Sequence, residues 1–109
     1  MRLAAELNQP PFALYESYHP GSLPAQSSFA DDGGGDVVVT VLKGAEEEDG
    51  SLVVRAYESA GRPASATIAV PVAGRSIEAE FRAHELKTFL VPRDAAAPVA
   101  ETNLLEWRP

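Results

Sequence analysis

The stretch from Asp36 to Glu58 constrains the fold of this chain most strongly. It runs DVVVTVLKGAEEEDGSLVVRAYE, with two segments rich in β-branched residues on either side of a short acidic segment. Valine, threonine and tyrosine suit a pleated, half-buried surface, and the Asp49-Gly50 pair accepts the positive φ that tight hairpin turns require. The pattern therefore predicts a β-hairpin whose turn is the acidic segment.

Alternation within the hairpin predicts which side chains share a face. The first strand should carry two opposed sets, with Val37, Val39 and Val41 on one face and Val38, Thr40 and Leu42 on the other. The second strand should do the same, with Leu52, Val54 and Ala56 opposed to Val53, Arg55 and Tyr57. This period of two is typical of strands with one face toward a core.

Period-two patterns continue after the hairpin. They cover residues 66–72, 76–81 and 86–91, with turn signals at 61–63 and 73–74. Pro71 must lie at an edge or a strand end, because it has no N–H for a central ladder. Residues 77–90 also contain good helix formers, but apolar residues at 77, 79 and 81 favour a strand. Residues 103–107 are expected to return as a last edge strand after an alanine-rich linker at 94–98.

The predicted fold class is all-β, an antiparallel β-sandwich of about six or seven strands with an irregular N-terminal lead-in. The lead-in covers residues 1–35, where four prolines and the sequence DDGGG oppose regular structure. It should pack on the domain or on a neighbouring domain, because a compact domain rarely carries so long a structureless stretch. Residues 36–109 should form the sandwich domain.

Composition excludes several classes of function. The formal net charge of −7 opposes binding to nucleic acid and docking on an anionic membrane surface. No apolar run approaches the length of roughly 20 residues that spans a bilayer. The sequence has no cysteine, so thiol catalysis and thiolate metal sites are excluded.

The sequence contains no recognisable catalytic or metal-binding motif. The acids at 46–49 are consecutive, whereas a calcium loop needs them at alternating positions. His19 and His84 are far apart and lack the spacing of a zinc site. No serine lies in a G-x-S-x-G elbow. We therefore expect no catalytic residue, no metal ligand and no cofactor in this chain.

Four residues are candidates for contact with a neighbouring domain: Arg55, Tyr57, Glu58 and Trp107. Arg55 lies beside apolar neighbours on a strand that reads as buried, so its charge needs a partner. Arg55 is expected either to form an ion pair or to snorkel along the sheet face within this domain, or else to contact a neighbouring domain. A single tryptophan is a poor sign of a sugar-stacking surface, so Trp107 is expected to anchor the core or an edge.

Five short segments also stand in an order that resembles a known family. They are AELNQP at 5–10, VVTVLK at 38–43, LVVRAYE at 52–58, ELKTF at 85–89 and TNLLE at 102–106. Together they resemble the C-terminal β-domain of family 38 glycoside hydrolases, the zinc-dependent α-mannosidases.

The resemblance implies that this chain is one end of a larger enzyme, here called the parent. In that family the zinc ligands and the nucleophilic aspartate belong to an N-terminal α/β domain, so no catalytic or metal-binding residue transfers to this chain. The implied role is a non-catalytic β-sandwich whose partners are the other domains of the same polypeptide. Zinc would belong to the catalytic domain of the parent. The alanine- and glycine-rich composition indicates a high-GC bacterial source, and the resemblance then implies a cytoplasmic protein, as bacterial mannosidases of this family typically are.

A free-standing carbohydrate- or protein-binding β-sandwich is the alternative. Under the first hypothesis we expect no direct glycan binding by this domain. The two hypotheses differ in whether the isolated chain has affinity for a glycan.

Overall fold

The computed structural model describes residues 2–107, which form six β-strands, one α-helix and one 3₁₀ helix. The helices are α1 (Arg2–Asn8) and η1 (Pro71–Ala73). The strands are β1 (Val37–Gly44), β2 (Leu52–Glu58), β3 (Ala64–Val70), β4 (Arg75–Phe81), β5 (Leu86–Val91) and β6 (Ala100–Thr102). Residue 1 of the expected lead-in and residues 108 and 109 of the expected domain lie outside the described residues.

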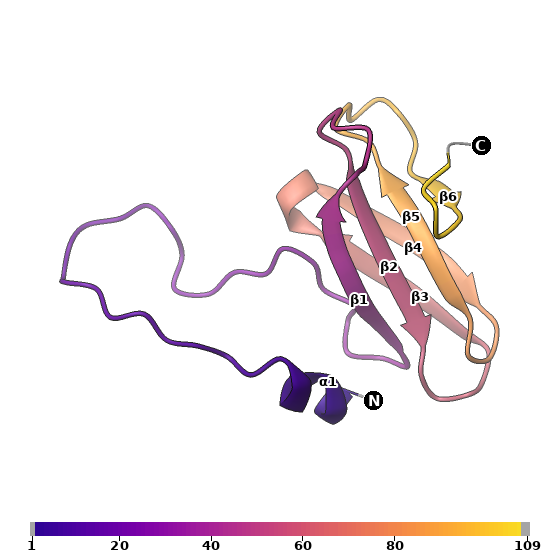
Figure 1. Ribbon diagram of the computed structural model, residues 1–109, viewed down its shortest axis with the longest axis horizontal. Coiled ribbons are helices and arrows are strands. Elements are labelled where there is room, and N and C mark those ends of the chain that lie inside the picture. Colours follow the sequence, from indigo (N-terminus) through magenta and orange to yellow (C-terminus); the bar gives the residue numbers. More distant parts are fainter. Residues whose placement is uncertain (1, 108–109) are drawn as a thin grey trace.

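The strands form two antiparallel sheets (Figure 1). One has the order β1-β2-β5-β6, and the other is the β3-β4 hairpin, which lies behind it in this view. Asp31 adds an isolated antiparallel bridge to Ala69 of β3. The predicted all-β antiparallel class is thus confirmed, and the sandwich arrangement stays a prediction.

One apolar cluster draws side chains from both sheets. Its buried members are Val37, Val54, Ala56, Ile68, Val70, Ile77, Phe81, Phe89 and Val91. The rings of Phe81 and Phe89 meet edge to face, with centroids 6.4 Å apart, and so join β4 to β5. The predicted faces of β2 are confirmed, because Val54 and Ala56 belong to this cluster.

The predicted faces of β1 are wrong beyond Val39. The register with β2 shifts between Val39 and Val41, so that Thr40 is left out of the pairing as a β-bulge. Leu42 therefore pairs with Val54 and packs against the core, while Val41 pairs with Arg55 on the other face. An extra residue reverses the alternation, and the residue types of the strand do not mark where it lies.

The predicted positions of β4 and β5 are correct, but the predicted end of β3 and the predicted last strand are wrong. β4 and β5 are strands, so the helix considered for residues 77–90 is absent. β3 ends at Val70, because Pro71 begins η1, and Val72 is therefore not a strand residue. The last edge strand is Ala100–Thr102 and not residues 103–107, which form a turn described below.

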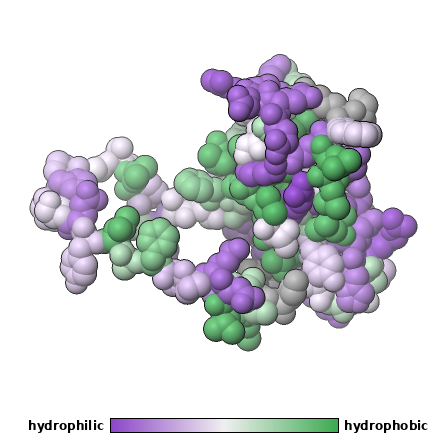
Figure 2. Space-filling model, viewed as in Figure 1, coloured by the Kyte–Doolittle hydropathy of each residue, from purple (hydrophilic) through white to green (hydrophobic). Residues whose placement is uncertain are grey.

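The N-terminal residues contain a helix that was not expected. Residues 2–8 have good helix-forming residues, and Pro10 stops the helix soon after it. Residues 9–30, here called the N-terminal arm, then extend away from both sheets (Figure 1). Apolar side chains stand along this arm in the space-filling view (Figure 2). No helix within residues 2–107 has the length and hydropathy needed to cross a membrane.

Ile68→Ala should strongly destabilise the chain. The side chain of Ile68 is fully buried in the cluster shared by the two sheets, so its truncation leaves a cavity. We expect a loss of about 2–5 kcal/mol in the free energy of unfolding, measured by urea denaturation followed by circular dichroism. The control Val72→Ala removes an exposed side chain and should change this value by less than about 0.5 kcal/mol. Equal losses in both variants would contradict the assigned core.

Candidate functional site

Residues 103–107, here called the tail, form a tight turn after β6. The side-chain oxygen of Asn103 accepts hydrogen bonds from the N–H groups of Leu105 (2.9 Å) and Trp107 (3.3 Å). The hydroxyl of Thr102 donates to the carbonyl of Trp107. Glu106 has a φ of 62°, which is uncommon for a residue with a side chain. The turn directs the carboxylate of Glu106 inward and leaves Leu105 and Trp107 exposed.

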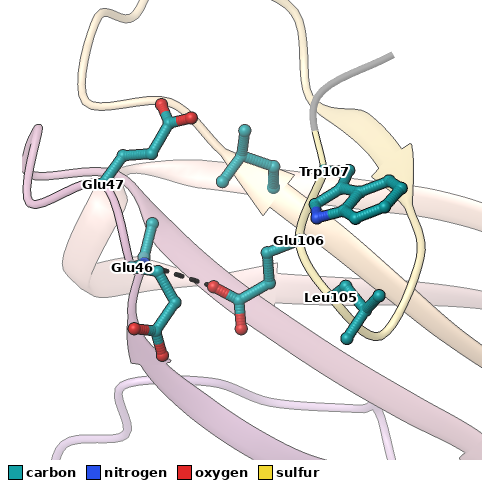
Figure 3. Close-up of a pocket in the computed structure, with 7 residues that line it drawn as sticks. Glu46, Glu47, Leu105, Glu106 and Trp107 are labelled. Carbon is teal, nitrogen blue, oxygen red and sulfur yellow. Dashed lines mark hydrogen bonds between the residues drawn. The ribbon is translucent and has the colours of Figure 1, made fainter.

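Glu106 joins the tail to the outer face of the four-stranded sheet. Its side chain is only 6% exposed, and its Oε1 lies 2.7 Å from Nζ of Lys43 and 3.2 Å from a terminal nitrogen of Arg55. Arg55 also donates to the carbonyl of Leu104 at 2.8 Å. The N–H of Glu46, in the β1–β2 turn, donates to the other carboxylate oxygen at 3.2 Å (Figure 3). Three donors, from β1, the β1–β2 turn and β2, therefore meet at this carboxylate.

These contacts favour the charged forms of both partners. The hydrogen bond from Lys43 lowers the pKa of Glu106, and this outweighs the burial of the carboxyl, which acts the other way. The hydrogen bonds to Glu106 and then Glu46 raise the pKa of Lys43. Glu106 is thus held as a carboxylate, which can accept hydrogen bonds but has no proton to deliver. We interpret it as an anchor for the tail.

A cavity of about 250 Å³ lies beside this anchor (Figure 3). Its walls come from the acidic turn, β5 and the tail: Ala45, Glu46, Glu47, Leu90, Leu105, Glu106 and Trp107. The carboxylate of Glu106 faces Lys43 and Arg55, so it is engaged in ion pairs. Acid–base catalysis of glycoside cleavage needs two carboxyl groups set across a bond, one of them protonated. The ionised anchor cannot serve as the acid, and both of its oxygens are already bonded to Lys43, Arg55 and the N–H of Glu46.

A second buried carboxylate, that of Glu58, lies at the end of β2. It accepts hydrogen bonds from the N–H groups of Ala60 (2.7 Å), Gly61 (2.9 Å) and His84 (2.8 Å). Burial raises the pKa of Glu58, but the bonds from His84, Ala60, Gly61 and Arg62 together bring it below its ordinary value. One side chain thus fastens the β2–β3 loop to the β4–β5 loop.

Gly61 is required in this arrangement. Its φ is +77°, and a Cβ added there would lie 2.9 Å from the ring of His84. That ring is in turn placed by Tyr57, whose hydroxyl lies 3.1 Å from Nδ1 of His84 and whose ring lies nearly parallel to it. The loop between β2 and β3 can therefore pass close to the histidine only with glycine at this position.

The structure does not bring the four candidate contact residues into one site. Arg55 and Tyr57 lie on the outer face of β2, and Glu58 is buried at its end. Trp107 is exposed in the tail beyond β6, so its expected role as an anchor of the core or an edge is wrong. The acid expected for Arg55 is Glu106 of the same chain, which confirms the intradomain ion pair. The Nε atom of Arg55 is buried without a hydrogen-bond partner among the described residues. The contact of these residues with a neighbouring domain stays a prediction.

Sequence reasoning missed the roles of Lys43, His84 and Glu106. Lys43 reaches the outer face only because of the bulge at Thr40. Glu106 belongs to the TNLLE segment that carried part of the family resemblance, and this was the one available signal. The side chain of His84 is exposed, but its backbone N–H bonds to Glu58.

Neither a metal site among the described residues nor a related protein adds to this description. Within residues 2–107, no three histidine, aspartate or glutamate side chains gather where they could hold a metal ion. Comparison of the chain with protein-family models, with curated protein sequences and with solved structures found no match.

Glu58→Gln should lower the free energy of unfolding at neutral pH. This free energy should also change less with pH in the variant. The amide replaces one acceptor oxygen by an NH₂ group that cannot accept the loop N–H bonds. Because the folded-state pKa of Glu58 is lowered, its contribution is present above the ordinary value of 4.5 and is lost as the pH falls through the folded value. The urea midpoints of unfolding at pH 7 and at pH 3 should therefore differ less for the variant than for the unmodified chain.

The matched control is Glu78→Gln, which changes an exposed glutamate on β4. This variant should keep the pH dependence of the unmodified chain. An unchanged pH dependence in Glu58→Gln would show that the buried carboxylate does not contribute in the way described.

Glu106→Ala should release the tail from the sheet. Without the carboxylate, the tail loses its contacts with Lys43 and the N–H of Glu46 and keeps only the bond from Arg55 to the carbonyl of Leu104, so the amides of Leu105 and Trp107 should exchange faster with deuterated solvent. Amide exchange followed by NMR measures this directly. The control Glu101→Ala removes the partner of Lys87, beside the tail but not in it, and should leave those two amides unchanged. If the amides of the tail exchange at the same rate in Glu106→Ala as in the unmodified chain, Glu106 does not anchor the tail.

Proposed function

We propose that this chain is the non-catalytic C-terminal β-domain of a zinc-dependent, retaining α-mannosidase. The parent enzyme would hydrolyse α-mannosides, and this domain would pack against its catalytic body. The five segments that resemble the family, in the same order, support the proposal. The all-β antiparallel fold is compatible with it.

The observation that carries the proposal is the exposure of the N-terminal arm. Phe12, Leu14 and Leu23 are 87%, 85% and 89% exposed, and Leu7 of α1 is 81% exposed. Single exposed apolar residues are ordinary, but a run of them over one extended segment marks a contact surface. A neighbouring domain of the same polypeptide would cover this arm, as the arrangement of the parent requires.

A second apolar surface supports the same assignment. Leu86, Leu104, Leu105 and Trp107 are 45–69% exposed at the end of the four-stranded sheet. The first three line an open cavity of about 450 Å³ between β5 and the tail. Trp107 therefore lies where a contact with another domain would bury it, and we assign it to that contact. Arg55 and Tyr57 lie on the same face of the sheet, nearer to its centre.

An immunoblot of the native cell extract tests the proposal. An antibody against this chain should detect a product several times heavier than the chain itself, which is 11.6 kDa. That product, once purified, should cleave an aryl α-mannoside and lose this activity when a chelator removes zinc. The isolated chain should fold, as judged by circular dichroism, and should show no turnover.

Two outcomes would contradict the proposal. A native product of about the mass of this chain would favour the free-standing binding module, and a titration with mannosides would then decide whether it binds a glycan. Turnover of the aryl α-mannoside by the isolated chain would show that a catalytic site lies within it.

A further inference from the structure

Strand β4 has an open edge whose hydrogen-bonding groups can be assigned from its partner. Ala69 of β3 exchanges two backbone hydrogen bonds with Asp31, at 2.9 and 2.8 Å, so its N–H and C=O face away from β4. Residues of an antiparallel strand alternate in the side to which these groups point. Ser76 is the register partner of Ala69, so its own N–H and C=O point away from β3. The same holds two and four residues later, at Glu78 and Glu80.

The other sheet edges are shorter or less regular. β1 is interrupted by the bulge at Thr40, and the N–H of Val39 donates to the carboxylate of Asp32. β6 has three residues, and β3 is bridged by Asp31. Bulges and short strands are common ways to block pairing at an edge. Among the described strands, β4 thus offers the longest regular edge with no strand beside it.

A groove runs beside this edge. Its volume is about 360 Å³, and it separates β4 from the inner faces of β5 and β6. The two-stranded sheet cannot cover all of the four-stranded sheet, so Ala79, Phe89 and Val99 form an apolar floor. At the β4 start, the guanidinium of Arg75 donates to the carbonyl of Ala97 at 2.9 Å and holds the β5–β6 loop in place.

The charges along the edge select what can pair with it. Glu78 and Glu80 both have exposed side chains on the solvent side of β4, and Glu101 lines the groove. One cation, Lys87, lines the same groove, and it is paired with Glu101 at 2.9 Å. Like charges directly opposite in a sheet are destabilising, and opposite charges stabilise by roughly 0.2–1 kcal/mol per pair. A second copy of β4 in antiparallel register would set glutamate against glutamate, which disfavours self-association at this edge.

We infer that the open edge of β4 binds an extended polypeptide segment in which basic and apolar residues alternate. Backbone groups of Ser76, Glu78 and Glu80 would pair with it, as in strand addition to other exposed edges. Its basic side chains would lie opposite Glu78 and Glu80 on the solvent side. Its apolar side chains would enter the groove over Ala79 and Phe89. This edge would bind such a strand whether or not the chain belongs to a mannosidase.

NMR titration of the isotopically labelled 109-residue chain tests the inference. The probe is the synthetic peptide KVKVKVK, and two matched peptides serve as controls: EVEVEVE, which reverses the charges, and KKKKVVV, which keeps the composition but loses the alternation. KVKVKVK should shift the amide signals of Ser76, Glu78 and Glu80. Its Kd should be about tenfold lower than that of either control.

Two variants of the chain make the test specific. Glu78→Pro removes an N–H that faces the open edge and no bond of the β3–β4 ladder, so it should abolish binding while the fold, checked by circular dichroism, is kept. The double variant Glu78→Lys with Glu80→Lys should reverse the preference, so that EVEVEVE binds more tightly than KVKVKVK. This second variant decides the matter if the proline variant does not fold.

Three results would overturn the inference. One is the absence of binding at millimolar peptide, and another is equal affinity for KVKVKVK and KKKKVVV, which would indicate attraction to the net negative chain alone. The third is a set of shifted amides confined to the tail or the N-terminal arm. The absence of binding would mean that the glutamates of β4 keep other strands away from the edge.

Discussion

The structure depends on the pairing of β2 with a strand on each side. β1 and β5 both bond to it in antiparallel register, and its two faces are both covered, so that Val53 and Val54 are each fully buried. The core of the two sheets contacts one face, and the anchor of the tail lies on the other at Arg55. At its end the strand carries Glu58, which fixes the two loops. The apolar core, the anchor of the tail and the two fixed loops thus all depend on this strand.

Much of this arrangement follows from local residue patterns. The alternation in β2 and β4 predicts their faces correctly, because a regular strand turns each successive side chain to the opposite side. The turns at Gly61 and Gly74 are also predicted, and both glycines have the positive φ that such turns require. The bulge, α1 and the turn of the tail were not predicted. Each depends on pairings between distant segments or on marginal local preferences, as at Glu106, which reaches back to Lys43 and Arg55.

The candidate site shows the same division between local and distant information. Arg55 was recognised because a charge within an apolar strand needs a partner, but which of sixteen acids would supply it is a matter of three-dimensional position. Glu58 and Glu106 can be buried as carboxylates because hydrogen-bond donors surround each of them. These donors are N–H groups for Glu58 and mainly cations for Glu106. Such donors are assembled by folding and leave little trace in a linear pattern.

The bulge at Thr40 has a consequence for how this sequence can change over time. Because one unpaired residue sets the frame for the rest of β1, substitution at this position is tolerable as long as the residue remains. Loss of that residue would exchange the surroundings of Leu42 and Lys43, so that a cation would enter the core. A change of length in the acidic turn that follows does not shift this frame, because the turn lies outside the β1–β2 ladder. Insertions and deletions in homologues should therefore accumulate after Gly44 and be rare before it.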